Sequence, residues 1–389
     1  MLVFEYNSYV YQPPPSVLFE ELPMTNVSLI SRRAAIAGAL AAVAATRRTP
    51  ALAEDAMASL VSAAKAEGSV IVDGPPIDTV RQALVGAFQS EYGIPVSYIS
   101  SGSSASGARV RAERAAGKYL LDVFVSGSDT PTLTFLPAGW LDKVEPILIA
   151  PDVVDKRKWK EGHLWYEDDG HTILRFQQYV FPELAVNTKL VRRGEVTTWK
   201  SLLDPKWQGK LIVKDPGISG AGASLISYFY IMFGADFVKK LYVGQKPMLS
   251  REPRQAMQWL AEGTYPILVG PDMPSLVQFQ QLGYPIAPIF PTDGPSVLSG
   301  GYGLACLINK APHPNAAKLF VNWLAGPAAQ EAFSKATHTL SLRNDVKYDG
   351  FPSFLFPQKG TKYMDTYDYK FVTEQRDPAL AKVRELLGE

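Results

Sequence analysis

The sequence contains a single cysteine, Cys306, and only four histidines among 389 residues. An intrachain disulfide and a cysteine-based zinc site are therefore excluded, and a metal site built from several histidines is disfavoured. No uninterrupted apolar run reaches the roughly 20 residues that cross a bilayer. The 39 basic and 38 acidic residues nearly cancel, so neither a polybasic nucleic-acid surface nor an acidic tail is expected.

The remaining composition is that of an ordinary folded protein. Hydrophobic residues make up 47% of the chain and charged residues 20%, which is too apolar for a disordered chain. The length is more than one compact core usually holds and suits two lobes or two domains.

Residues 1–53 are predicted to be an N-terminal extension with an export signal. Arg32 and Arg33 precede an uncharged, Ala-rich stretch, and residues 51–53 give the small-x-small pattern of a cleavage site near Ala53. The paired arginines resemble a twin-arginine signal. Residues 1–23 fit no signal peptide, so we expect translation to start at Met24. No cysteine follows the predicted cleavage site, so a soluble periplasmic protein without a lipid anchor is expected.

Strands and helices are predicted to alternate along the rest of the chain. Short apolar strands are expected at 69–73, 94–99 and 121–125, separated by amphipathic helices at 78–92 and 105–116. This β-α-β-α-β order predicts an α/β protein with a parallel sheet covered by helices. The second half repeats the pattern, with expected strands at 210–214, 265–269, 286–290 and 302–308 and helices at 222–233, 234–243, 253–262, 274–282, 314–325, 327–336 and 378–387.

The segment 198–210, TWKSLLDPKWQGK, resembles a characteristic stretch of the extracellular solute-binding proteins of ABC importers, in their ferric-ion-binding-like branch. The loop 101–104 followed by 111–113, the crossover 185–188 and the helix 315–324 are similar to other stretches of that family. The resemblance spans about residues 68–345. It implies the type II periplasmic binding fold, in which two lobes, each a mainly parallel sheet flanked by helices, are joined by a two-segment hinge.

On this resemblance, lobe 1 is expected to hold residues 54–180 and 294–389, and lobe 2 residues 181–293. The ligand is expected to lie between the lobes, and hinge closure presents the complex to an ABC permease in the inner membrane. The protein is expected to be a monomer with a small-molecule ligand, no nucleic-acid partner and no cofactor.

The candidate ligand-binding residues follow from the rule that ligands bind outside the carboxyl ends of the strands in open α/β sheets. Two of the selected loops are rich in Ser and Gly and lead into helices, whose N-terminal N–H groups bind anions. The expected ligand is therefore a small organic anion, although simple helix capping also explains such loops. The selected residues are Asp73, Ser101, Gly102, Ser103, Ser104, Ser126, Gly127, Ser219, Gly220, Ala221 and Asp272.

Two further residues are candidates because of their position near the predicted crossovers. Arg175 could pair with a carboxylate or phosphonate, or it could lie on a solvated strand face or make a structural ion pair. Tyr302, like Tyr179 and Phe181, could stack on a ring of the ligand or belong to the core.

A metal or metal-chelate ligand is the alternative within the same class of protein. The ferric members of the family hold iron with two adjacent tyrosines, and the corresponding segment 270–275 has none and offers only Asp272. His163 and His171 flank the acidic residues 167–169, where a polar surface loop is the simpler interpretation. No metal ligand is therefore assigned.

A secreted enzyme on the same bilobal fold is the alternative outside the class. The chain has no Walker sequence and no G-x-G-x-x-G motif after a strand, and two Ser-containing loops miss the G-x-S-x-G pattern by their last residue. Cys306 lies in an apolar strand, where an inert buried thiol is expected. No catalytic residue is therefore assigned.

Overall fold

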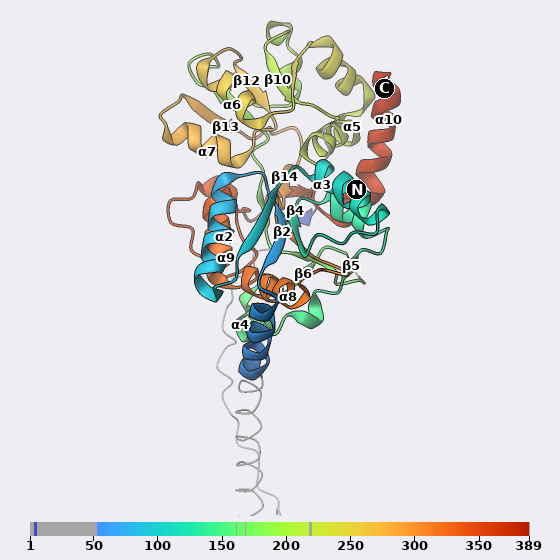
Figure 1. Cartoon of the computed structure of the whole chain (residues 1–389). Helices are drawn as coiled ribbons and strands as arrows, with labels where there is room; N and C mark the ends of the chain where they lie inside the picture. Colours follow the sequence, from blue (N-terminus) through green and yellow to red (C-terminus); the bar gives the residue numbers. More distant parts are fainter. Residues whose placement is uncertain (1–3, 6–52, 161, 168, 218–219, 389) are drawn as a thin grey trace, which may run out of the picture.

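The computed structural model describes residues 4–5, 53–160, 162–167, 169–217 and 220–388. Helices and sheets form two lobes, one above the other in Figure 1, and the predicted two-lobed α/β fold is confirmed. Lobe 1 contains the sheet around β2 (Val70–Gly74) and β4 (Val123–Ser126), and lobe 2 contains the sheet around β10 (Leu211–Lys214) and β12 (Ile267–Val269).

The sheet of lobe 1 has the strand order β3-β2-β4-β15-β7-β6, and β5 also pairs with β15. The neighbours of β2 run parallel to it, as predicted, whereas β15 runs antiparallel to both β4 and β7. The strands are β2 (Val70–Gly74), β3 (Val96–Ser100), β4 (Val123–Ser126), β5 (Leu141–Asp142), β6 (Leu164–Trp165), β7 (Ile173–Arg175) and β15 (Leu304–Ile308).

Helices cover this sheet because each helix has an apolar face, which is removed from water when it packs against the sheet. In α2 (Asp78–Tyr92), Val80, Leu84 and Phe88 are buried, and Gly93 ends the helix in the left-handed conformation. The other helices of this lobe are residues 53–67, α3 (Ser103–Ala115), α4 (Pro151–Val154), α8 (Pro314–Leu324) and α9 (Pro327–Thr337).

The sheet of lobe 2 has the order β11-β10-β12-β9-β13. Strand β10 is parallel to β11 and β12, and β9 is antiparallel to its neighbours. Its elements are β9 (Leu184–Asn187), β10 (Leu211–Lys214), α5 (Ala221–Lys239), β11 (Met248–Ser250), α6 (Pro253–Glu262), β12 (Ile267–Val269), α7 (Met273–Gln281) and β13 (Ile286–Ile289).

Helix α5 joins two helices that the sequence predicts separately. They meet at Gly234, which has non-helical angles of φ 80° and ψ 179° inside the assigned helix. By length and composition the stretch Ala221–Gly244 could cross a membrane, but half of its most apolar window is buried inside the protein. Its apolar side chains therefore serve the core of lobe 2.

The two chain crossings between the lobes lie side by side. Strand β8 (Tyr179–Val180) pairs antiparallel with β14 (Ser296–Ser299), and Glu183 accepts a hydrogen bond from the backbone N–H of Val297 at 3.0 Å. These strands belong to a small sheet of order β1-β16-β14-β8, which we call the hinge sheet. Its other two strands are β1 (Phe4–Glu5) and β16 (Lys362–Asp365). Such paired crossings form the two-segment hinge that the resemblance implies.

The C-terminal helix extends from the hinge sheet onto lobe 2. The π-helix η8 (Phe371–Arg376) and α10 (Asp377–Leu387) pack beside α5, as Figure 1 shows, and their apolar side chains join its core. The sequence assigns this segment to the continuation of lobe 1. In the structure, this segment packs on lobe 2 instead. Its apolar side chains and those of the long helix α5 bury one another, which removes both from water.

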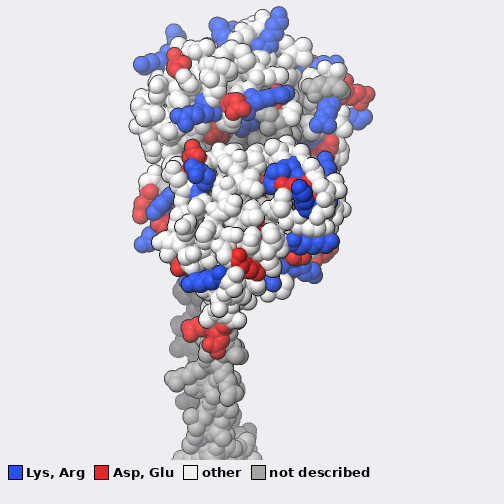
Figure 2. Space-filling view, in the orientation of Figure 1, with Lys and Arg blue, Asp and Glu red and all other residues white. Residues whose placement is uncertain are grey.

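Short elements connect the larger ones. The π-helices besides η8 are η1 (Pro131–Phe135) and η6 (Lys240–Gly244), and the 3-10 helices are η2 (Glu145–Ile147), η3 (Lys156–Lys158), η4 (Lys200–Leu203), η5 (Pro205–Trp207) and η7 (Ser353–Leu355). On the face drawn in Figure 2, basic and acidic side chains are interspersed over both lobes, as the nearly neutral composition predicts.

Candidate functional site

The start of α5 faces lobe 1 and holds a carboxylate from it. The backbone N–H of Gly220, the N-cap residue of α5, donates a hydrogen bond of 2.5 Å to Oδ2 of Asp129. Asp129 lies three residues after β4 of lobe 1, where the helical segment that continues into η1 (Pro131–Phe135) begins, so this bond crosses between the lobes. A helix N-terminus carries unpaired N–H groups and a partial positive charge, and both stabilise an anion placed there.

The other oxygen of Asp129 pairs with Arg376 of η8. Arg376 Nη1 and Asp129 Oδ1 are 2.5 Å apart, and both side chains are almost completely buried. Asp377 accepts a second contact from the same guanidinium, at 3.0 Å. The Asp129 carboxylate therefore ties together lobe 1, the start of α5 and the C-terminal segment.

The start of α3, the second Ser/Gly turn, surrounds a buried carboxylate. Asp73 at the end of β2 accepts a hydrogen bond from Ser101 at 3.2 Å and from Arg109 at 2.8 Å. Burial raises the pKa of Asp73, and these donors partly offset that effect. Arg109 also bonds Glu113 at 2.6 Å. Asp73 and Ser101 are thus already engaged with each other, and their contacts anchor the first turn of α3.

The two turns meet at the loop that carries Asp129. Gly107 of α3 packs so closely on Thr130 that a Cβ at Gly107 would lie 3.3 Å from its side chain. The adjacent Asp129 bonds Gly220. Gly107 near the start of α3 and Gly220 at the start of α5, distant in sequence, therefore contact adjacent residues of one segment between the lobes. Ser219 and the side chain of Ser103 lie outside the described part of the chain, Ser104 is exposed, and Ala221 begins α5.

The loop after β4 is packed rather than open. Ser126 is buried, and its backbone carbonyl accepts a hydrogen bond from the Tyr367 hydroxyl at 3.3 Å. A Cβ on Gly127 would lie 3.4 Å from the carbonyl oxygen of Gly301. These contacts position the loop and leave little surface of Ser126 for a ligand.

Arg175 has partners inside the protein. It is 3% exposed, lies 2.8 Å from Asp365, and places its guanidinium over the ring of Tyr367 at 5.2 Å. Asp365 belongs to β16 of the hinge sheet, so the pair links that sheet to β7. These contacts favour a structural role, although Nη2 of Arg175 has no hydrogen-bond partner among the described residues.

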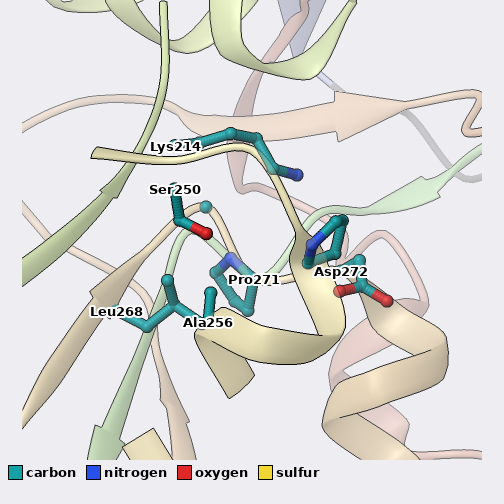
Figure 3. Close-up of a pocket in the computed structure, with 8 residues that line it drawn as sticks. Lys214, Ser250, Ala256, Leu268, Pro271 and Asp272 are labelled. Carbon is teal, nitrogen blue, oxygen red and sulfur yellow. The ribbon is translucent and has the colours of Figure 1, made fainter. Parts of the chain in front are cut away.

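A hollow in lobe 2 gathers polar groups that sequence reasoning mostly missed. It lies at the carboxyl ends of β10 and β12, and Figure 3 shows Lys214, Ser250 and Asp272 around it. Burial lowers the pKa of Lys214, and the charge of Asp272 opposes that shift. The strand-end rule that selects Asp272 also applies to Lys214, the last residue of β10. Lys214 was not predicted because only the Ser/Gly-rich residues after β10 were selected.

The charge of Asp272 acts on two tyrosines outside the hollow, Tyr302 and Tyr179. Burial, with the negative charge of Asp272 added to it, raises the pKa of Tyr302 to about 12. The same two causes contribute to the raised pKa of Tyr179, which lies in β8. Tyr302 also lies near Tyr98, and Tyr98 near Asp73. Tyr302 therefore lies within reach of charges from both lobes.

The groups considered for a metal are engaged separately. His171 Nδ1 contacts Glu145 at 2.5 Å, His163 Nε2 contacts the carbonyl of Val153 at 2.7 Å, and Glu167 accepts hydrogen bonds from Thr172. Among the described residues, no group of three or more His, Cys, Asp or Glu side chains is arranged to hold a metal ion.

The one thiol is inaccessible. Cys306 is fully buried in β15, and burial, with the nearby Glu167, raises its pKa well above the ordinary value. A thiol in this environment is a poor nucleophile.

Comparison with known proteins agrees with this geometry. A relative from Haemophilus influenzae described as an uncharacterized protein is 24% identical over 330 residues, covering 82% of this chain and 90% of its own. The periplasmic binding protein AfuA from Actinobacillus pleuropneumoniae, with exogenous fructose-6-phosphate bound, has a TM-score of 0.65 at 19% identity, covering 82% of this chain and 99% of its own. Iron-bound HitA from Pseudomonas aeruginosa has a TM-score of 0.64 at 17% identity, with the same coverages.

The family model of the bacterial extracellular solute-binding proteins matches residues 74–331. This is a family of binding proteins rather than of enzymes, and the resemblance found in the sequence is confirmed. The chain therefore belongs to the bacterial extracellular solute-binding proteins, the solute-capturing components of ABC importers.

Proposed function

We propose that the solute is a small organic anion, bound between the two lobes and enclosed when they close. The observation that carries this proposal is the Asp129 carboxylate on the N–H of Gly220. The carboxylate of Asp129 is chemically the same group as that of an organic acid. Its position supports the idea that the start of α5 accepts an anion presented from the side of lobe 1.

The start of α3 provides the complementary half of the proposed site. Gly102 precedes α3 in an extended conformation, with φ −70° and ψ 152°. The α3 turn and the α5 turn flank the loop around Asp129, so one solute could reach N–H groups from both. We propose that the solute is surrounded by residues Ser101 to Ser104, Gly127, Gly220 and Tyr302, with Ser219 and Ala221 beside Gly220.

Closure of the lobes follows from differential binding. A solute that bonds both lobes is bound more tightly when they are together, and it shifts the population toward the closed form. The apparent affinity depends on how populated that form is without solute. The Asp129–Gly220 bond holds the lobes together by the same kind of contact, so it raises that population.

The proposal extends to the location and partners of the protein. The predicted signal and cleavage near Ala53 would release residues 54–389 as a monomer, free in the periplasm and without a lipid anchor. The closed complex would then deliver its solute to an ABC permease of the inner membrane.

A metal or metal chelate is the second candidate, since HitA of similar fold is described with iron bound. A lysine in the hollow of lobe 2 favours an anion instead. Lys214 lies beside Asp272 in the hollow of lobe 2, and its positive charge opposes the approach of a bare cation. AfuA is described with a phosphate ester bound, which is consistent with anion binding on this fold.

Thermal melting tests the proposal, because a ligand of the folded state raises the melting temperature by mass action. The matched pairs are fructose 6-phosphate against fructose and gluconate against sorbitol, with carboxylates, phosphonates and sulfonates added. We expect at least one anion to raise the melting temperature and its neutral counterpart to leave it unchanged. A shift with ferric salts, while every anion is without effect, would favour the metal candidate.

A further inference from the structure

A serine, a histidine and an aspartate of lobe 1 form a hydrogen-bonded series. Oγ of Ser69 lies 3.2 Å from Nε2 of His313, and Nδ1 of His313 lies 2.8 Å from Oδ2 of Asp122. The three residues are far apart in sequence. Ser69 directly precedes β2, Asp122 directly precedes β4, and His313 is the N-cap residue of α8. This is the order of contacts in a Ser–His–Asp triad, where the acid orients the imidazole and the imidazole takes the serine proton.

Asp122 determines which nitrogen of His313 carries the hydrogen. The aspartate is fully buried, and its carboxylate also accepts hydrogen bonds from the backbone N–H of Ile71 at 2.7 Å and of His313 itself at 2.8 Å. A carboxylate that accepts from these donors accepts from Nδ1 as well, so Nδ1 is the protonated nitrogen. In the neutral ring, Nε2 then has a free lone pair and accepts from the Ser69 hydroxyl. His313 is therefore placed as a general base for Ser69.

The serine is accessible from one side. Ser69 is half-buried, and the side chain of His313 is 21% exposed. The neighbouring Gly68 is exposed and has a left-handed φ of 82°, and a Cβ added to it would meet no atom of the described residues within 4 Å. The surface beside Ser69 is therefore open, in contrast to that of the fully buried Cys306.

This series lies away from the proposed solute site. The strand-end rule places a ligand at the carboxyl end of β2, where Asp73 lies, whereas Ser69 lies at the amino end. The strand has five residues and spans about 17 Å at roughly 3.3 Å per residue. Helix α8 lies at the end of lobe 1 that is farther from lobe 2 (Figure 1). A role for Ser69 is therefore independent of the proposed function.

The start of α8 limits what chemistry Ser69 supports. Its backbone N–H groups at Asn315 and Ala316 donate to the carboxylate of Glu67 at 2.9 and 2.8 Å, and the N–H of His313 donates to Asp122. These groups are therefore engaged and do not stabilise an oxyanion. The loss of one such donor costs roughly 100- to 1,000-fold in rate. Activated esters are expected to react, and amides, whose leaving group is poor, are not.

We propose that Ser69 is a nucleophile for small acyl esters with a good leaving group, with His313 as its base and Asp122 as the positioning residue. Oγ of Ser69 bonds to the acyl carbon while Nε2 of His313 takes the hydroxyl proton. The bond from the acyl carbon to the leaving oxygen then breaks, and His313 gives its proton to that oxygen. Water attacks the acyl-serine in the same way, loses a proton to His313 and releases the carboxylic acid, and the proton returns to Ser69. Asp122 stabilises the imidazolium formed in each step.

The test follows acylation of the full-length protein with p-nitrophenyl acetate, by the release of nitrophenol and by mass spectrometry of the intact and digested chain. We expect one acetyl group per polypeptide, located on Ser69, and slow turnover afterwards. A fluorophosphonate, which reacts with activated serines, should label the same residue. Ser69→Ala should abolish both reactions. Ser62→Ala removes an exposed serine of the preceding helix and should react like wild type.

The histidine variant separates catalysis from helix capping. Asparagine is favoured at an N-cap, so His313→Asn should keep the melting temperature close to that of wild type. It should slow acylation of Ser69 about 100-fold or more, the contribution of a general base. His313→Gln provides the same comparison if the asparagine variant fails to fold.

The outcomes distinguish the proposed nucleophile from a structural contact. Acylation of Ser69 in the wild type, together with its slowing in the folded His313 variant, supports the proposal. Folded wild-type protein that leaves Ser69 unmodified, with acetyl groups only on lysines, would overturn it. Equal rates of Ser69 acylation in wild type and the His313 variant would overturn it as well, and the contacts among Ser69, His313 and Asp122 would then serve only to cap α8. Anion capture between the lobes is unaffected by any of these results.

Discussion

The carboxylate of Asp129 and the backbone N–H of Gly220 lie 2.5 Å apart and belong to different lobes. The same carboxylate pairs with the buried Arg376 of the C-terminal segment. One side chain therefore joins three parts of the chain at the point where an incoming anion would meet the start of α5. The first prediction follows from this position.

Asp129→Asn should loosen the contact between the lobes. Removing one partner of a buried ion pair costs about 3–5 kcal/mol, and Asp377, which still contacts Arg376, should reduce that loss. We expect a lower free energy of unfolding by denaturant and a larger ligand-free radius of gyration in small-angle X-ray scattering. Asp142→Asn, an exposed carboxylate of the same lobe, is the control. An unchanged radius of gyration would show that this bond does not hold the lobes together.

The buried Glu183 in the hinge should make stability depend on pH. Burial raises its pKa well above the usual 4.5, and Oε2 has no hydrogen-bond partner among the described residues. The folded protein therefore keeps this proton when the unfolded chain has lost it. The contribution is fully present below about pH 4.5 and is lost as pH rises toward the folded pKa, at about 1.4 kcal/mol per pH unit.

Glu183→Gln keeps the acceptor for the N–H of Val297 and removes the titration. Its free energy of unfolding should exceed that of the wild type by an amount that grows as the pH is raised above 4.5. Denaturant unfolding at several pH values measures the difference. Glu385→Gln, whose side chain is 76% exposed, should show no such trend. A parallel pH profile for Glu183→Gln and wild type would contradict the assignment.

Arg175→Met distinguishes a structural arginine from a ligand-binding one. The variant leaves Asp365 with two neutral donors, Gln178 at 3.1 Å and the backbone N–H of Tyr367 at 3.0 Å, and without its positive partner. Stability should therefore fall by about 3–5 kcal/mol. Affinity for the best-binding anion, measured by calorimetry under conditions where the variant is folded, should stay within a few-fold of wild type. A large loss of affinity would instead place Arg175 at the ligand.

Local sequence patterns predicted the helices well because each carries its own end signals. Helix α2 has buried residues at helical spacing and Gly93 after its last turn, and α6 (Pro253–Glu262) begins with Pro253 and ends before Gly263. The antiparallel position of β15 between β4 and β7 could not be predicted this way. Strand direction depends on where the chain returns from the other lobe, which no local pattern encodes.

The ligand-binding residues stay a prediction. The structure brings the α3 residue Gly107 and the α5 residue Gly220 to adjacent residues after β4, an arrangement that the strand-end rule implies. Asp129 was missed because it follows the selected residues Ser126 and Gly127, and its partners, Gly220 and Arg376, are far away in sequence. Arg175 shows the opposite case, since its pairing with Asp365 depends on β16 joining the hinge sheet. Composition reveals a charge but not the neighbour that neutralises it.

Native mass spectrometry of the protein, expressed from the full sequence and purified without denaturation, tests most directly whether an organic anion is the cargo. We expect one small organic acid or phosphate ester per polypeptide, released on unfolding and identifiable by its mass. Bound iron without any organic anion, or a neutral solute in its place, would contradict the proposal.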